Sequence, residues 1–154
     1  MYDFVFLSAL IVQATFLSLF VAKHLIADFY LQPPYMWKNK GTYGHMGGIA
    51  HSGIHALFTG IVIFLANLSL ISTSFLFTVP VLTKLGVLII VAMLFDFTIH
   101  YHMDWFKMFW CKKQNYTPEH PKFWHWLGID QFVHMMTYIV LSFILAYYMP
   151  ALYI

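Results

Sequence analysis

Four apolar stretches, each long enough to cross a lipid bilayer, most constrain what this chain can fold into. They cover residues 4–31, 46–68, 81–104 and 127–149. A spanning helix needs about 20 apolar residues, and helices satisfy their own backbone hydrogen bonds in lipid. The chain is 61% hydrophobic and 9% charged, whereas a soluble domain has roughly 25% charged residues. We therefore predict an all-α, polytopic membrane bundle of about four transmembrane helices, forming one domain over residues 1–154.

Breaks between the stretches support this division. The first stretch ends at Pro33 and Pro34, which cannot continue a helix. Polar or turn-forming residues fill 33–45, 67–80 and 112–125, as is typical of connections. The first stretch has no basic segment before it and no small-residue cleavage site after it, so we predict a retained span rather than a signal peptide. The chain contains no arginine, which argues against a nucleic-acid partner.

Histidine and aspartate occur near one end of each stretch, spaced by four residues. This spacing places the side chains of a set on one helix face. The sets are His24 and Asp28; His51 and His55; Asp96, His100 and Asp104; Asp130 and His134. Because the chain passes back and forth, these four helix ends share one side of the bundle. We expect the sets to meet in a single polar cluster at that side.

The composition of the cluster indicates a metal site. Imidazole and carboxylate ligands without thiolate suit Zn, with Mn or Fe as alternatives. One catalytic zinc takes three protein ligands, fewer than this cluster offers. We therefore expect two ions, as in hydrolases that activate water between metals. The expected metal ligands are His24, Asp28, His51, His55, Asp96, His100, Asp130 and His134.

The depth of the carboxylates suggests separate roles. Asp96 lies deepest in the third stretch and is expected to bridge the ions. Asp104 lies about 12 Å further along the helix, at 1.5 Å per residue, and is expected at the rim. Asp104 or Asp28 is the expected general base. Lys23 and His45 are expected near a substrate phosphate, and Gln32 and Gln131 are expected to orient ligands.

The distribution of lysine predicts the orientation. Seven of the eight lysines lie on the side of the polar cluster, and Lys84 lies near the other side. Cytoplasmic segments carry an excess of lysine and arginine. The polar cluster is therefore expected at the cytoplasmic face, with both termini outside.

Several segments resemble a known family. KHLIADFYLQ, HSGIH, FDFTIHYHMD and DQFVH resemble small inner-membrane proteins of bacteria and their phages that carry a domain of unknown function. The family pattern is His-x3-Asp-x2-Leu-Gln, a His pair, Asp-x3-His and Asp-Gln-x2-His. The matching residues are His24, Asp28, Leu31, Gln32, His51, His55, Asp96, His100, Asp130, Gln131 and His134. The chain is also similar, more distantly, to membrane-bound metal-dependent hydrolases, which implies hydrolysis only by analogy.

Three functional interpretations follow. The leading one is a hydrolase of the bacterial inner membrane that acts on a lipid or a lipid-linked phosphate ester. The second is a metal-stabilised interaction module without enzyme activity, oligomeric or bound to a protein partner in a phage or defence complex. The third is a divalent-metal carrier, which is disfavoured because a carrier needs ionisable groups near the bilayer midplane. A single His–Asp pair in a membrane helix is commonly a hydrogen bond between helices, so the metal interpretation depends on the four sets together.

Overall fold

The computed structural model describes residues 2–71 and 79–151, and these are helical apart from short turns. The elements are α1 (Tyr2–Leu25), η1 (Ile26–Tyr30), α2 (Pro34–Asn39), α3 (Met46–Ile71), α4 (Val79–Lys113) and α5 (Pro121–Ala151). Four helices are long and apolar enough to cross a membrane: those containing α1, α3, α4 and α5. The prediction of an all-α bundle with four membrane-spanning helices is confirmed.

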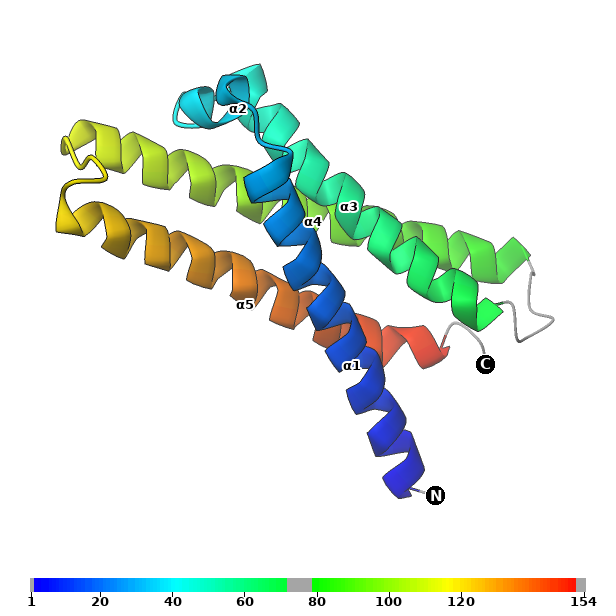
Figure 1. Ribbon diagram of the computed structural model, residues 1–154. Helices are drawn as coiled ribbons and strands as arrows, with labels where there is room; N and C mark the ends of the chain where they lie inside the picture. Colours follow the sequence, from blue (N-terminus) through cyan, green and yellow to red (C-terminus); the bar gives the residue numbers. More distant parts are fainter. Residues whose placement is uncertain (1, 72–78, 152–154) are drawn as a thin grey trace.

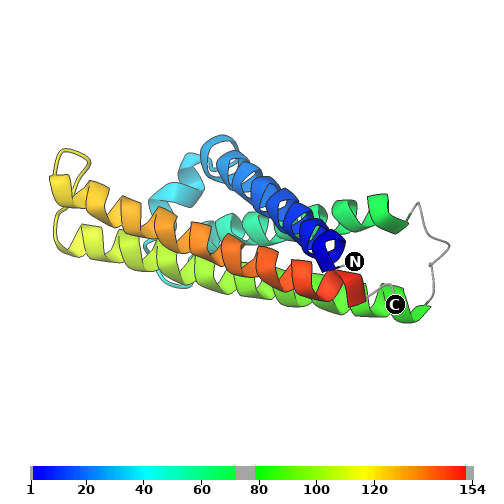
Figure 2. The same ribbon diagram turned by 90° about the horizontal axis from the view of Figure 1, so that it is seen from below.

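The four long helices form a closed ring. Helix α3 packs against α4, α4 against α5, α5 against α1, and α1 against α3. Figure 1 shows α4 and α5 running side by side, with α1 crossing them. Figure 2 shows the same oblique course of α1 from below. The α4–α5 connection and α2 lie at one end of the bundle, and the start of α1 and the end of α5 lie at the other.

Two helices extend further than the sequence predicted. Helix α4 ends at Lys113 rather than at residue 104, and α5 begins at Pro121 rather than at residue 127. The extension of α4 has a physical cause in its buried stripe. Asp104, Lys107 and Cys111 continue the buried face of this helix beyond His100, with the spacing of three or four residues that one helix face requires.

The first membrane helix changes its geometry close to the polar cluster. Helix α1 passes at Leu25 into the π-helical turn η1, closed by a 3.0 Å hydrogen bond from the Leu31 N–H to the Ile26 carbonyl. This turn carries Asp28. π-helical turns are rare and occur often at functional sites. The sequence predicted a helix as far as Pro33 but not this change.

The short helix α2 is held tightly over the start of α3. Gly44 adopts a positive φ of 78°, and its N–H donates to the Tyr101 hydroxyl at 2.6 Å. A Cβ on Gly47 would come within 2.7 Å of the Tyr35 carbonyl oxygen, so this approach requires glycine. The packing places Lys40, which follows α2, inside the bundle.

The interior of the bundle has an apolar and a polar half. The apolar half is formed by Phe16, Phe20, Ile63, Leu85, Ala92, Tyr138, Leu141 and Leu145. The polar half contains buried histidines, aspartates and lysines, and lies toward the end that carries α2. Large apolar side chains such as Ile11, Val91 and Phe132 point outward and are exposed. This is the surface that a lipid environment covers.

Candidate metal centre

Four side chains from three elements converge on one point in the polar half. Asp28 comes from η1, His51 and His55 from α3, and His100 from α4, with one ligand atom of each within 4.8 Å of the others. Asp28 Oδ1 lies 3.1 Å from His51 Nε2 and 3.2 Å from His55 Nε2. His51 Nε2 lies 3.2 Å from His100 Nε2. The i, i+4 spacing of His51 and His55 directs both rings to the same side of α3.

These separations suit a bound ion. Ligands at 2.0–2.1 Å in a tetrahedron lie about 3.4 Å from one another. His51 Nε2 has Asp28 Oδ1, Asp104 Oδ2 and His100 Nε2 at 3.1–3.2 Å. A ring nitrogen carries either one hydrogen or one lone pair, so it cannot satisfy all three by hydrogen bonding. A cation held by Asp28, His51, His55 and His100, whose ligand atoms lie within 4.8 Å of one another, would bind the ring nitrogens and the carboxylate together.

A second group adjoins the first and shares His100 with it. It consists of His100, Asp104 and His134. His134 Nε2 is buried without a hydrogen-bond partner and lies 3.9 Å from Asp104 Oδ1. The His100 ring is stacked between those of His55 and His134, with centroids 3.6 and 4.0 Å away. The chain of imidazoles therefore runs from α3 across α4 to α5.

Three of the four aspartates in the polar half are paired with buried lysines. Lys23 donates to Asp96 at 2.5 Å, Lys40 to both oxygens of Asp104 at 3.1 Å, and Lys107 to Asp130 at 3.0 Å. Asp28 differs, because no lysine nitrogen among the described residues lies within ion-pair distance of it. Its partners are His24, His51, His55 and His100. Asp28 is therefore the carboxylate of this half whose partners are histidines alone, in a group that could hold a metal ion.

The sequence suggested a nearby lysine as a partner for Asp104, but it did not predict that Lys23 and Lys107 pair with Asp96 and Asp130. Two features of the sequence indicate them. Lys23 follows the buried Phe20 by three residues, and Lys107 follows Asp104 by three residues, so each continues the buried face of its helix. Lys23 was expected beside a substrate phosphate. Its ammonium group instead donates to Asp96 and to the His55 carbonyl at 3.1 Å.

The predicted ligands divide into two sets by position. The structure brings together Asp28, His51, His55, His100 and His134, and adds Asp104. His24, Asp96 and Asp130 lie outside both groups. Asp96, expected as a bridge between ions, accepts hydrogen bonds from Lys23 and from the Thr59 hydroxyl at 2.6 Å.

Asp104 does not lie at the rim as the sequence analysis expected. Its exposed fraction is 3%. The expectation was wrong because α4 continues beyond Asp104 to Lys113 and α2 folds back over α3, so that Lys107 and Lys40 both lie within ion-pair distance of Asp104. Asp104 Oδ2 lies 3.1 Å from His51 Nε2, which makes this carboxylate a link between the two groups.

The glutamines expected to orient ligands both contact histidines. Gln32 Nε2 lies 3.0 Å from His51 Nδ1 and 2.9 Å from His51 Nε2. Gln131 Oε1 lies 3.0 Å from His24 Nε2. His45, expected beside a phosphate, accepts a hydrogen bond at Nδ1 from the Gly47 N–H at 2.9 Å. That contact ties His45 to the start of α3.

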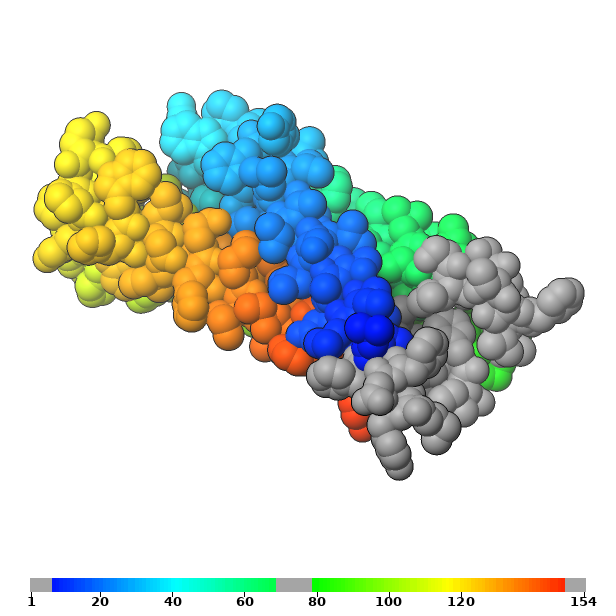
Figure 3. Space-filling view, turned by 60° about the horizontal axis from the view of Figure 1, so that its bottom comes forward, coloured from blue at the N-terminus to red at the C-terminus, as the bar shows by residue number. Residues whose placement is uncertain are grey.

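A cleft of about 650 Å³ opens beside the first group. It lies between η1, α2, the end of α4 and the start of α5, and Figure 3 shows a hollow between the α4–α5 hairpin and the segment around α2. Within the described ranges, Asp28 is the one member of either group that lines it. The cleft thus connects the candidate metal centre with the surface.

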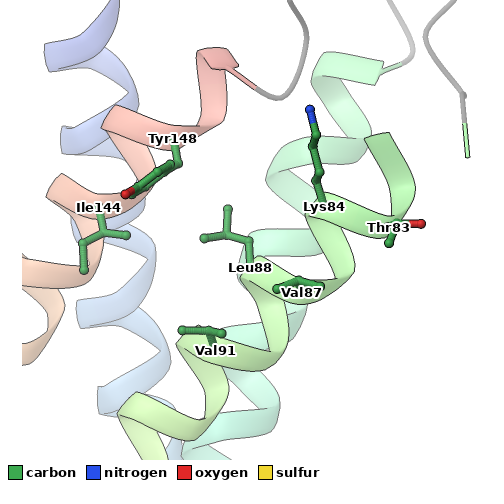
Figure 4. A pocket seen from close by; sticks show the side chains of 7 residues that line it. All are labelled: Thr83, Lys84, Val87, Leu88, Val91, Ile144 and Tyr148. Carbon is green, nitrogen blue, oxygen red and sulfur yellow. The ribbon is translucent and has the colours of Figure 1, made fainter. Parts of the chain in front are cut away.

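A second cavity of about 630 Å³ lies in the opposite half of the bundle, between α4 and α5. Figure 4 shows its lining, mainly apolar side chains such as Val87, Leu88 and Ile144, with Lys84 beside them. None of the residues in the two His/Asp groups lines it. Of these two cavities, the first is the one that adjoins a His/Asp group of the described residues.

Comparison with known proteins supplies the family. No curated protein and no solved structure matches the chain. The model of a family described as "Protein of unknown function (DUF3307)" matches residues 16–153, a range that includes every residue of both candidate metal groups. The match confirms the expected relationship to a domain of unknown function. The chain belongs to the DUF3307 family.

Proposed function

We propose that this protein is a metal-dependent hydrolase embedded in the membrane, acting on a lipid or a lipid-linked phosphate ester. The observation that carries the proposal is the convergence of His51, His55 and His100 on Asp28 at the inner end of a cleft. Catalytic zinc sites use three protein ligands and keep one position open. Three histidines and a carboxylate that reaches the cleft match that requirement.

Each residue of the site would have a separate role. His51, His55 and His100 would hold a zinc ion, or manganese or iron. The ion, when bound, would polarise a phosphoryl oxygen and acidify a coordinated water. Asp28 would accept the proton of the attacking water, since it alone of these residues lines the cleft. His24, 3.2 Å from Asp28 Oδ2, would orient this carboxylate.

The second group supplies the place for a second ion. Asp104 and His134 lie next to the first group, and two ions about 3.5–4 Å apart are a common arrangement in hydrolases. Both groups contain His100, and Asp104 of the second group lies 3.1 Å from His51 of the first, so these residues would be available to either ion. Elemental analysis of the purified protein gives the number of ions per chain and so tests whether two ions bind.

The orientation proposed for the site is toward the cytoplasm of a bacterial inner membrane. Three of the lysines do not count toward the surface charge that sets the orientation. Lys23, Lys40 and Lys107 are buried and paired with aspartates inside the bundle. Among exposed lysines the bias remains: Lys38, Lys112, Lys113 and Lys122 lie at the site end, and Lys84 lies in the other half. Reporter domains fused to the termini are expected to be active outside; activity in the cytoplasm at both ends would reverse the orientation.

The experiment that tests the proposal compares two neighbouring histidines of α4. The purified full chain is analysed for bound metal and assayed with phosphatidic acid and a polyprenyl phosphate. His100→Ala should lose both metal and turnover. His102→Ala is the matched control, since His102 is exposed and outside both groups, and should keep both. A wild-type content well below about one ion per chain, or equal losses in both variants, would refute the metal centre.

One observation favours a second candidate, a metal-stabilised module without catalysis. The two groups take ligands from η1, α3, α4 and α5, so bound metal would cross-link every layer of the bundle. Such a module would bind a protein partner or another copy of itself. In the experiment above, metal present in the wild type with no turnover of either lipid would favour this candidate.

A further inference from the structure

The cleft beside Asp28 has an unusual charge distribution along its depth. Four lysines line it, of which Lys40 and Lys107 are buried and Lys38 and Lys112 are exposed. The two buried lysines are neutralised by Asp104 and Asp130. The two exposed lysines have no carboxylate within ion-pair distance in the part of the chain that the structure describes.

This distribution makes the mouth of the cleft positive. The carboxylate that lines the cleft is Asp28, which faces the histidines. Glu119, in the α4–α5 connection, is exposed and does not line the cleft. A cleft lined by charge of one sign concentrates its electric field and attracts ligands of the opposite sign. The ligand selected by this mouth is therefore an anion.

Part of the wall of the cleft is apolar. Phe29, Met108, Phe123 and Leu127 line the same cleft. Phe29 is 72% exposed and follows Asp28 in η1, so it stands on the outer face of the bundle. An acyl chain leaving the cleft past Phe29 would enter the surrounding bilayer directly. Trp37, also in the lining, is of the residue type enriched at the lipid headgroup level.

We propose that this cleft binds the phosphate headgroup of an anionic lipid, with Lys38 and Lys112 on the phosphate and Phe29 and Leu127 beside the acyl chain. A phosphate monoester carries up to two negative charges at neutral pH, which two lysines match. Binding in this cleft brings the phosphate toward Asp28. The inference that the bound lipid is then hydrolysed rests on the proposed function, whereas the binding itself does not.

The test measures binding of phosphatidic acid to the full chain in detergent by native mass spectrometry. The protein is first stripped of metal with a chelator, so that hydrolysis cannot deplete the ligand. The double variant Lys38→Gln with Lys112→Gln should bind phosphatidic acid about tenfold or more weakly, because it loses two charged hydrogen-bond donors. Lys38→Arg with Lys112→Arg should keep the binding, since the charge remains.

The matched control removes the same charge elsewhere. Lys84→Gln with Lys113→Gln changes two exposed lysines that do not line the cleft, and should bind like the wild type. Equal binding by the cleft variant and this control would overturn the proposal. Inorganic phosphate competing as well as phosphatidic acid would also overturn it, because the site would then select free phosphate. Phosphatidylcholine should compete poorly.

The result also separates this proposal from the proposed function. Lysine-dependent binding with no turnover by metal-loaded protein would support the lipid site and reject the hydrolase. Turnover that is unchanged in the Lys38→Gln, Lys112→Gln variant would support the hydrolase and reject the lipid site. Equal melting temperatures of the cleft variant and its control show that both have folded.

Discussion

The two halves of the bundle interior are formed by the same helices, but different interactions stabilise them. The apolar half is filled by side chains such as Phe20, Ile63 and Leu145. The polar half is filled by histidines, aspartates and lysines that are equally buried. In the first half, packing is sufficient, and side chains of similar volume can replace one another at small cost. In the second half, each charge requires a partner, because an unpaired buried charge is strongly destabilising.

This difference indicates which half carries the function. A bundle of this length can be stabilised by apolar packing along its whole axis, and ionisable groups inside membrane helices are expensive to bury. Three Lys–Asp pairs offset part of that expense, yet they do not account for the convergent histidines. The members of the two groups that form no ion pair with a lysine are Asp28, His51, His55, His100 and His134. They are the ones that a metal ion would unite.

The largest effect is expected from removing two ligands of α3 together. His51→Ala with His55→Ala should abolish metal binding by the first group, because both rings face Asp28 Oδ1 and neither has a substitute on that helix; an ion held by His100, Asp104 and His134 would be the most that remains. Ile63→Ala changes the apolar half of the same helix and should keep the wild-type metal content. Inductively coupled plasma mass spectrometry of the purified chain measures both. A wild-type metal content in the double variant would contradict the assignment of His51 and His55 as metal ligands.

The next effect tests the pairing rule. Lys23→Met leaves Asp96 as an unpaired buried charge and should destabilise the protein by about 3–5 kcal/mol. Adding Asp96→Leu removes that charge and should restore most of the stability. Denaturant titration in mixed micelles gives the free energies of unfolding. If the double variant is no more stable than the single one, Lys23 stabilises the bundle by packing on Tyr138, 4.6 Å away, rather than by pairing.

A smaller loss is expected in the apolar half. Leu145→Ala removes a fully buried side chain and should cost about 2–3 kcal/mol through the cavity that it leaves, without changing bound metal. Val140→Ala is the control on α5, because Val140 is exposed. Unfolding and metal content are measured on the same samples. A loss of metal in Leu145→Ala would show that the two halves are coupled rather than separate.

The sequence predicted the four spanning helices and the meeting of the polar sets at one end, for a physical reason. Apolar length alone sets four spanning helices, and the spacing of four residues places His51 beside His55 and His100 near Asp104 on any helix. Back-and-forth topology then brings these sets to one end. Such local rules do not depend on how the helices tilt or rotate against each other.

The features that were missed all depend on contacts between distant segments. Lys40 and Asp104 are 64 residues apart in the sequence. They meet only because α2 folds back over α3. The π-helical turn at Asp28 and the burial of Asp104 on the inner face of the extended α4 likewise follow from packing. No periodicity in the chain encodes the cleft, since its walls come from four separate segments.

The smallest effect concerns a residue that supports a ligand without belonging to either group. Gln32 Nε2 lies within 3.0 Å of both ring nitrogens of His51 and holds the edge of that ring. Gln32→Ala should weaken metal binding about tenfold, which is the low end of the range for residues that orient ligands. Gln32→Asn should weaken it as well, because the asparagine side chain is one methylene shorter and its amide does not reach His51. Gln114→Ala, in the exposed α4–α5 connection, is the control. Competition with a chromophoric chelator measures the affinities. If Gln32→Ala binds metal as tightly as the control, His51 is oriented by Asp28 and Asp104 alone. The ion pairs of the polar half, rather than uncharged side chains such as Gln32, would then hold the ligands in place.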